Sequence, residues 1–308
     1  MDNLTHSLAG ALLGQLGLKR LTGRAMGTLI IAANLPDIDA LYSFGGTGLG
    51  FRRGITHGPA AMLVLPVALT GLVLAFDRVW PKRDGIPVRP AMILLLAFIG
   101  TLSHPVLDWL NSYGIRLLEP LSSRWFYGDT LFIIDVWLWF ALLAAVHRSQ
   151  ILERRGRSDW RRPALWGFAA IAAYVAANFA FTTVAERKTE QRLIARHGVQ
   201  PTLVVANPVP LTPWRREMLW RDASRHGNGI FSPGEGLRLD PRMAPNRLDH
   251  PALGRAASRD EKVRAFLFWS RMPVVVEQDG RAFLTDQRFL ARGGSSFQVP
   301  LDSDSGSQ

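Results

Sequence analysis

Long apolar runs that carry almost no charge limit what the first half of this chain can fold into. Residues 58–76 and 163–185 contain no charged side chain, residues 90–107 contain only His104, and residues 130–146 contain only Asp135. Crossing a bilayer core takes about 20 apolar residues in a helix. The sequence therefore predicts four long membrane spans. Two shorter apolar pieces, 4–18 and 25–35, predict a hairpin of short helices packed against those spans.

The composition changes after residue 185, where the chain becomes polar and rich in arginine. Residues 186–198 predict a helix that continues the last span and ends on Gly198. Short strand patterns follow, and the pair Asp279–Gly280 predicts the turn of a hairpin. We therefore expect a mainly α protein: a polytopic membrane domain over 1–185, a small α+β extramembrane domain over 186–300, and a disordered tail over 301–308. Histidines 197, 226 and 250 show no ligand spacing and are expected at the surface.

Basic residues are distributed unequally between the predicted loops. One side of the membrane carries thirteen of them and the other side four. The first set is Lys19, Arg20, Arg24, Arg78, Lys82, Arg83, Arg89, Arg148, Arg154, Arg155, Arg157, Arg161 and Arg162, and the second is Arg52, Arg53, Arg116 and Arg124. The positive-inside rule makes the first side cytoplasmic and leaves the C-terminal domain periplasmic or extracellular. We therefore predict a multi-pass protein of a bacterial inner membrane.

Much of the formal net charge of +11 lies in these short loops, and no nucleic-acid-binding motif accompanies it, so no nucleic-acid partner is expected. The chain has no cysteine, which excludes disulfides and thiolate metal sites.

Ionisable residues gather at the predicted outer ends of the apolar segments. His104 and Asp108, in "LSHPVLDWLNSYG", are four residues apart and so share one face of a helix. The connectivity brings further side chains to the same membrane level: His6, Asp37, Asp39, His57, Asp129 and Asp135. Ionisable groups at this depth are costly and usually functional.

Each of these residues also has an ordinary structural role when taken alone. His6 suits a helix cap or the surface, Asp37 a turn after Pro36, and Asp39 a helix cap. His57 suits a bond to a backbone carbonyl, and His104 with Asp108 a hydrogen-bonded pair along a helix. Asp129 suits a helix N-cap, and Asp135 a pair with Arg124 or Arg53.

Together these residues suit a metal site better than separate structural roles. Neutral imidazole and carboxylate groups are typical zinc ligands. We predict His6, Asp37, Asp39, His57, His104 and Asp108 as metal ligands. They outnumber what one tetrahedral ion needs, so one or two divalent ions, with Zn²⁺ as the favoured metal, are expected.

The motifs "DNLTHSLAG", "ANLPDIDAL", "FRRGITHG", "LSHPVLDWLNSYG" and "RWFYGDTLFIID" resemble the YdjM-like family of bacterial inner-membrane proteins, which are described as metal-dependent hydrolases. The resemblance covers the membrane half, and "VVANPVPLTPWRRE" resembles the longer members. The ligand order is also distantly similar to that of zinc-dependent phospholipase C and the S1/P1 nucleases. That likeness implies one ion on His57, His104, Asp108 and Asp37 or Asp39, and a second on His6 with Asp108 bridging. The chain departs from it downstream, because the next histidine, His147, lies on the predicted cytoplasmic side.

We therefore expect a metal-dependent phosphoesterase that acts on a membrane lipid or a lipid-linked phosphoester. Asp37, Asp39, Arg53 and Asp135 are the predicted catalytic residues, with Arg53, beside Arg52, holding the phosphate. Two alternatives stay open. One is an ion or proton transporter, since intramembrane His and Asp residues also mark ion pathways. The other is a non-catalytic membrane protein with a structural metal, whose outer domain binds a periplasmic protein partner.

Overall fold

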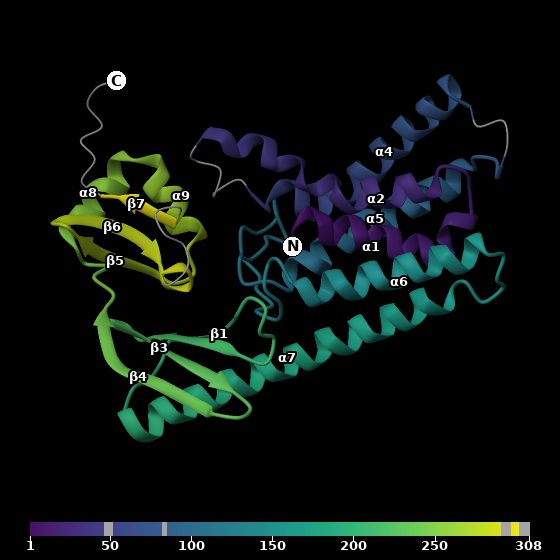
Figure 1. Cartoon of the computed structure of the whole chain (residues 1–308). Coiled ribbons are helices and arrows are strands. Elements are labelled where there is room, and N and C mark those ends of the chain that lie inside the picture. Colours follow the sequence, from purple (N-terminus) through teal and green to yellow (C-terminus); the bar gives the residue numbers. More distant parts are fainter. Residues whose placement is uncertain (46–51, 82–84, 291–296, 302–308) are drawn as a thin grey trace. The chain divides into compact units, whose positions relative to one another are not determined.

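A computed structural model describes residues 1–45, 52–81, 85–290 and 297–301 of the chain. It divides into two compact units (Figure 1). Unit 1 comprises Met1–Asp39 and Arg53–Ala180, and unit 2 comprises Ala40–Arg52 and Phe181–Gln308. The tail predicted to be disordered lies, from residue 302 onward, outside the described residues.

Unit 1 is built from helices. They are α1 (Asn3–Gln15), α2 (Ala25–Asn34), α4 (Pro59–Val79), α5 (Pro90–Trp109), α6 (Val136–Arg154) and the first half of α7 (Arg162–His197). Three 3₁₀ segments connect them: η1 (Leu18–Arg20), η2 (Leu35–Gly45), which continues into unit 2, and η3 (Ile55–His57). The predicted pair of short helices, α1 and α2, is confirmed. The second of them ends at Asn34, just before Pro36, and the chain continues directly into η2.

Among the described residues, three helices are long and apolar enough to cross a membrane: α4, α5 and α7. The prediction of a fourth span over 130–146 is wrong. Its helix, α6, starts only at Val136, because the Asp135 carboxylate caps it by accepting a hydrogen bond from the Leu138 amide at 2.9 Å. The second half of α6 then contains Arg148, Glu153 and Arg154, so the apolar run is too short.

Local sequence explains where the other helices begin. The Asp2 carboxylate caps α1, accepting hydrogen bonds from the Thr5 amide at 3.0 Å and from the Thr5 hydroxyl at 2.6 Å. Helices α4 and α5 each begin with a proline, which lacks only an N–H that the first turn does not use.

Helix α2 packs against α1, α4 and α5, and α1 also packs against α6 (Figure 1). Two glycines allow the closest approaches. A Cβ on Gly10 would lie 2.8 Å from the Leu29 carbonyl oxygen, and a Cβ on Gly100 would lie 2.6 Å from the Ala32 Cβ. Small residues at such crossings are typical of helix packing in membranes. As a result the C-terminal end of α2 lies against α5, beside the residues of the candidate site.

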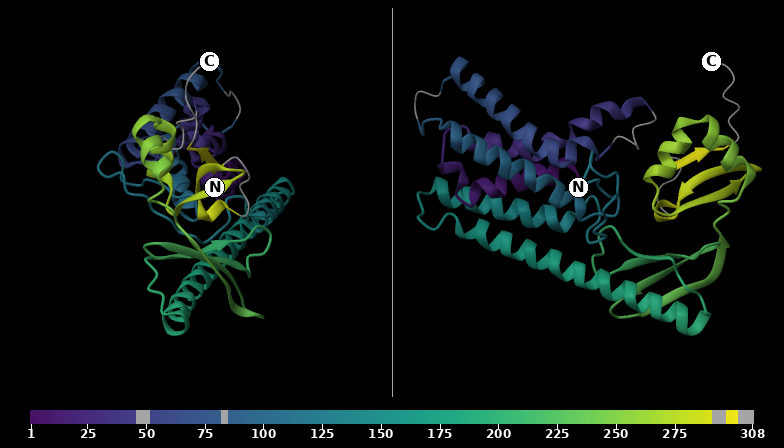
Figure 2. Two further views of the ribbon diagram at one scale, coloured as in Figure 1. Left: turned by 90° about the vertical axis from the view of Figure 1, so that its left-hand side faces the viewer. Right: turned by 180° about the vertical axis from the view of Figure 1, so that it is seen from behind.

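Unit 2 contains the end of α7 and two antiparallel sheets. The first has the order β1 (Leu203–Pro208), β2 (Arg216–Arg221), β3 (Arg225–Ser232), β4 (Gly236–Pro245). This sheet packs against α7 through Ala185, Ala206, Met218 and Phe231, and both views in Figure 2 show the two side by side. The second sheet has the order β5 (Pro273–Gln278), β6 (Arg281–Asp286), β7 (Gln298–Pro300), and is accompanied by α8 (Pro251–Arg259) and α9 (Glu261–Trp269).

Several predictions for unit 2 can be compared with this arrangement. The helix ending on Gly198 is confirmed, since α7 ends at His197 and Gly198 has φ 60°. The hairpin is also confirmed, because Gln278 pairs with Arg281 and both Asp279 and Gly280 have positive φ. The expectation that His226 lies at the surface is wrong: it is buried, and its Nδ1 lies 3.1 Å from Asn246 Oδ1.

Candidate metal centre

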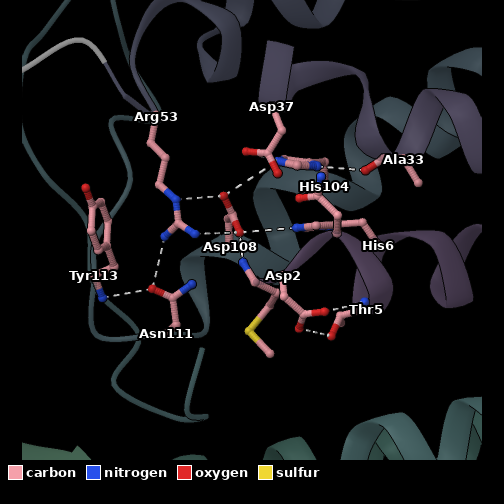
Figure 3. Close-up of polar contacts among 12 residues, drawn as sticks. Asp2, Thr5, His6, Ala33, Asp37, Arg53, His104, Asp108, Asn111 and Tyr113 are labelled. Carbon is pink, nitrogen blue, oxygen red and sulfur yellow. Dashed lines mark hydrogen bonds and ion pairs between the residues drawn. The ribbon is translucent and has the colours of Figure 1, made fainter. Parts of the chain in front are cut away.

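Four side chains from three segments of unit 1 converge on one point. Asp37 comes from η2, His57 from η3, and His104 and Asp108 from successive turns of α5. One ligand atom from each lies within 4.8 Å of those from all the others. Figure 3 shows Asp37, His104 and Asp108 pointing toward one another, with His6 of α1 beside them. The i,i+4 spacing thus brings His104 and Asp108 to one face, as the sequence predicts.

The His104 ring is oriented by the backbone of α2. Its Nδ1 lies 2.7 Å from the Ala33 carbonyl oxygen, which can only accept a hydrogen bond. Nδ1 therefore carries the proton, and the neutral ring presents the lone pair of Nε2 to the centre. This Nε2 lies 3.7 Å from Asp37 and 3.5 Å from Asp108. A backbone carbonyl behind a ligating histidine is a common outer-shell arrangement in metal sites.

His57 is held in a similar way, by Thr56 and Asp39. Its Nδ1 lies 2.9 Å from the Thr56 hydroxyl and 3.6 Å from Asp39 Oδ2. Its Nε2 faces the centre, 3.6 Å from Asp108 and 3.1 Å from His104 Nε2. With a proton on each Nδ1, the two Nε2 atoms direct lone pairs at each other, and a cation between them would stabilise that pairing.

Asp39 therefore lies behind His57 and outside the group of four. Its Oδ2 also accepts hydrogen bonds from the Arg53 amide at 2.7 Å and the Thr56 hydroxyl at 3.2 Å. Of the two aspartates in "NLPDIDAL", only Asp37 belongs to the cluster of possible ligands. Asp39 therefore lies where it can orient the His57 ring, rather than where it could itself hold the metal.

The two oxygens of the Asp108 carboxylate face different partners. Oδ1 lies 3.3 Å from His6 Nε2 and contacts the Met1 amino group, while Oδ2 faces His57 and His104. The Arg53 guanidinium spans both oxygens, with Nη2 3.2 Å from Oδ1 and Nε 3.1 Å from Oδ2. Carboxylates that bridge two metal ions divide their oxygens in this way.

Arg53 is 3% exposed and has several partners besides Asp108. Its Nη1 donates to Asn111 Oδ1 at 3.1 Å and to the Gly114 carbonyl at 3.3 Å, and its guanidinium lies over the Tyr113 ring, 4.8 Å from the centroid. Figure 3 shows this side of the cluster. The arginine balances the charge of the buried carboxylate here; its use in holding a phosphate stays a prediction.

His6 adds a third imidazole. Its ring stacks on that of His104, with centroids 3.8 Å apart and planes inclined by 16°. The side chain is fully buried; Nδ1 has no hydrogen-bond partner among the described residues, and Nε2 lies 3.3 Å from Asp108 Oδ1 without the geometry of a hydrogen bond. A buried imidazole without such a partner is costly. Ligation of a metal by Nε2 would remove that cost, so the residues present fit a divalent ion.

Two other predicted residues are placed elsewhere. Asp135 caps α6 and accepts a hydrogen bond from the Tyr174 hydroxyl at 2.9 Å, so it lies outside the group of four, and its catalytic role stays a prediction. Asp129 is buried and has φ 49°. The expectation that Asp129 caps the helix is wrong, because Asp135 does so.

Sequence reasoning missed the residues that support the cluster. The Ala33 carbonyl, Thr56 and Asn111 orient His104, His57 and Arg53. The only available signal was that Thr56 and Asn111 lie within the motifs themselves.

Comparison with known proteins adds one finding. The family described as YdjM inner membrane protein matches residues 1–185, which include every member of the cluster. No curated protein and no solved structure matches the chain. The match covers more than half of the sequence, and the chain therefore belongs to the YdjM inner membrane protein family.

Proposed function

We propose that this protein is a membrane-embedded, metal-dependent hydrolase that cleaves a phosphoester of a lipid or lipid-linked compound. The observation that carries the proposal is the division of the Asp108 carboxylate, whose Oδ1 faces His6 and whose Oδ2 faces His57 and His104. A carboxylate that presents its two oxygens to different histidines is suited to bridge a pair of divalent ions.

The donor sets indicate which residues would hold each ion. Asp37, His57, His104 and Asp108 would hold the first, and His6 with Asp108 would hold the second. Imidazole and carboxylate donors favour Zn²⁺. When bound, such ions stabilise the attacking and leaving oxygens of a phosphoryl displacement and lower the pKa of bound water.

The chain's own residues would orient the site. The Ala33 carbonyl keeps His104 Nε2 unprotonated, and Asp39 with Thr56 keeps His57 Nε2 turned to the centre. Arg53 offsets the charge of Asp108 and, in this proposal, shifts toward the substrate phosphate as a charge-assisted donor.

A second candidate is a structural metal site in a non-catalytic membrane protein. It is favoured by burial, because the side chains of His57, His104 and Asp108 are almost completely inaccessible. Structural zinc sites are closed, whereas catalytic ones keep a coordination position open to substrate. Asp37 is less buried than the other three residues. The two candidates therefore differ in whether a coordination position on the side of Asp37 is open to substrate.

Phosphate release from a broad panel of phospholipids and lipid-linked phosphates tests the hydrolase. We expect zinc-loaded protein to turn over at least one member, and chelation to lower the rate by about 10³-fold, because several kcal/mol of transition-state stabilisation are lost. His197→Ala, which alters an exposed histidine of unit 2, is the matched control and should retain full activity. If no substrate is cleaved at full metal occupancy, the structural site is the correct assignment.

We also propose that the site lies at the outer face of the inner membrane and that unit 2 is periplasmic, available there to a protein partner. The support is the unequal distribution of basic residues between the loops, together with the packing of α6 against α1 and α7. In this proposal α6 carries the chain back to the basic side, although it is not among the three candidate spans. A reporter fused after Arg157, between α6 and α7, should report the cytoplasm, and one fused after Gly198 should report the periplasm. A cytoplasmic signal from the second fusion would invert the topology.

A further inference from the structure

A large apolar groove lies between α2 and α4, away from the metal centre. Its volume is about 970 Å³, and its walls include Ile31, Leu69, Leu72, Val73 and Phe76. Helices α2 and α4 lie side by side in both Figure 1 and Figure 2. The groove reaches the N-terminal end of α2 at Arg24 and Ala25, whereas the metal centre lies at the opposite end of α2, near Ala33.

The end of this groove is strongly basic. Lys19, Arg20 and Arg24 line it. A second, polar pocket of about 430 Å³ shares Arg20 and Glu153 with the groove and is lined further by Arg157, Arg161 and Trp160. The guanidinium carbons of Arg20 and Arg161 lie 4.6 Å and 5.2 Å from the centroid of the Trp160 ring. The apolar groove thus continues into a region lined by Lys19, Arg20, Arg24, Arg157 and Arg161, called the basic basin below.

The carboxylates at this end do not balance its cations. Glu153 pairs with Lys19 and Arg20, Asp77 with Arg24, and Asp159 with Arg157. Among the residues that the structure describes at this end, five cations therefore face three carboxylates. The Arg20 side chain remains 51% exposed, and its nearest guanidinium nitrogen lies 3.5 Å from Glu153. The basin therefore suits an additional anion.

The apolar part of the groove runs along a candidate membrane span. Only 22% of the most apolar window of α4 is buried inside the protein, which leaves most of that surface available to lipid. The basic basin lies where α4 ends, beside Phe76 and the loop residues Gly85 and Ile86, which is the depth of lipid headgroups. Basic pockets between membrane helices are known to bind anionic lipid headgroups.

We propose that the groove holds one anionic glycerophospholipid, with its phosphate between Arg20 and Arg161 and an acyl chain along the apolar walls formed by α2 and α4. Arginine suits this role because its planar fork can donate two hydrogen bonds to a phosphate. A second copy of the chain fits less well, because its apolar surface would leave the unbalanced cations unpaired. The site lies apart from the metal centre and does not depend on any hydrolase activity.

Two kinds of variant of the full-length protein test the site. Arg20→Gln, alone and with Arg161→Gln, removes the headgroup contacts. Gly27→Leu fills the groove, since a Cβ at this exposed position of α2 would have no atom within 4 Å. Each has a matched control. Arg78→Gln removes an exposed arginine near the end of α4 that lines neither pocket, and Gly71→Leu adds the same side chain at an equally open glycine outside the groove.

The measurement is lipid bound per protein, by native mass spectrometry after reloading delipidated protein from vesicles of phosphatidylglycerol or of phosphatidylcholine. We expect one phosphatidylglycerol on the wild type and on both controls. Loss of charged donors should weaken its binding about tenfold to hundredfold. Gly27→Leu should also lose the lipid, while the metal content and melting temperature stay unchanged.

Three results would overturn the proposal. The first is equal lipid retention in the arginine variants and the Arg78→Gln control. The second is equal binding of phosphatidylcholine and phosphatidylglycerol by the wild type. The third is a concentration-dependent dimer that Gly27→Leu abolishes, which would assign the groove to a second copy of the chain.

Discussion

His104→Ala and Asp108→Ala should each remove most of the metal from the purified protein. Both residues supply ligand atoms to the group of four, and in the proposed two-ion site Asp108 supplies one oxygen to each ion. Loss of an outer-shell partner already weakens metal binding by about 10–100-fold, so loss of a direct ligand should exceed about 100-fold. Elemental analysis of protein purified with limiting zinc measures the effect.

Asp39→Asn provides a graded comparison for these variants. Asp39 stands behind His57 and outside the group of four, so its loss should weaken binding by about 10–100-fold and not abolish it. His197→Ala should leave the metal content unchanged, because that histidine is exposed and lies in unit 2. Unchanged metal in folded His104→Ala and Asp108→Ala would contradict the site as described.

In unit 1, the sequence could predict the elements that carry a local signal. Uncharged runs long enough to span a bilayer predict α4, α5 and α7, and the prolines at positions 59 and 90 mark the first residues of α4 and α5. The error at α6 has the same origin. An apolar run does not reveal that Asp135, in its middle, caps a helix and so excludes the preceding residues from it.

Several members of the candidate site were predictable from the sequence, but their geometry was not. The spacing of His104 and Asp108 fixes a shared face, and connectivity alone brings His6, Asp37 and His57 to the same membrane level. Which of Asp37 and Asp39 faces the centre depends on the path of η2, and the pairing of Arg53 with Asp108 joins segments far apart in the sequence. Such long-range contacts leave no periodic signal.

Unit 2 shows the same limit. Asp279–Gly280 predicts a hairpin because its turn needs two residues with positive φ. Nothing in the local pattern shows that Asp286 and Arg288, at the end of the same hairpin, are both buried.

The ion pair of Asp286 and Arg288 is the basis of the second large effect. Arg288 donates hydrogen bonds to Asp286 through Nε at 2.8 Å and through Nη2 at 2.8 Å. The Ser270 hydroxyl and the Met272 amide also donate hydrogen bonds to this carboxylate. Asp286→Ala should destabilise the second sheet of unit 2 by about 3–5 kcal/mol, because it removes the buried carboxylate that accepts two hydrogen bonds from the buried Arg288 guanidinium.

Hydrogen exchange of the β5 and β6 amides in the full-length protein measures this loss. The variant should exchange about 10²–10⁴-fold faster than the wild type. Asp249→Ala, at an exposed aspartate of the same unit, is the control and should exchange at the wild-type rate. Equal protection in Asp286→Ala would show that the pair contributes little to stability.

The Asp286 carboxylate should also make the stability of the second sheet of unit 2 depend on pH in the wild type. Burial alone would raise the pKa of Asp286, but the charge and hydrogen bonds of Arg288, with those of Ser270 and Met272, outweigh it and lower the pKa from 3.8 to about 2. Because the folded pKa lies below the unfolded one, the stabilisation is present above pH 3.8 and is lost as the pH falls toward 2. Protection of β5 and β6 should therefore decline across that interval in the wild type, whereas in Asp286→Ala this contribution to the decline should be missing, since the titrating group is gone.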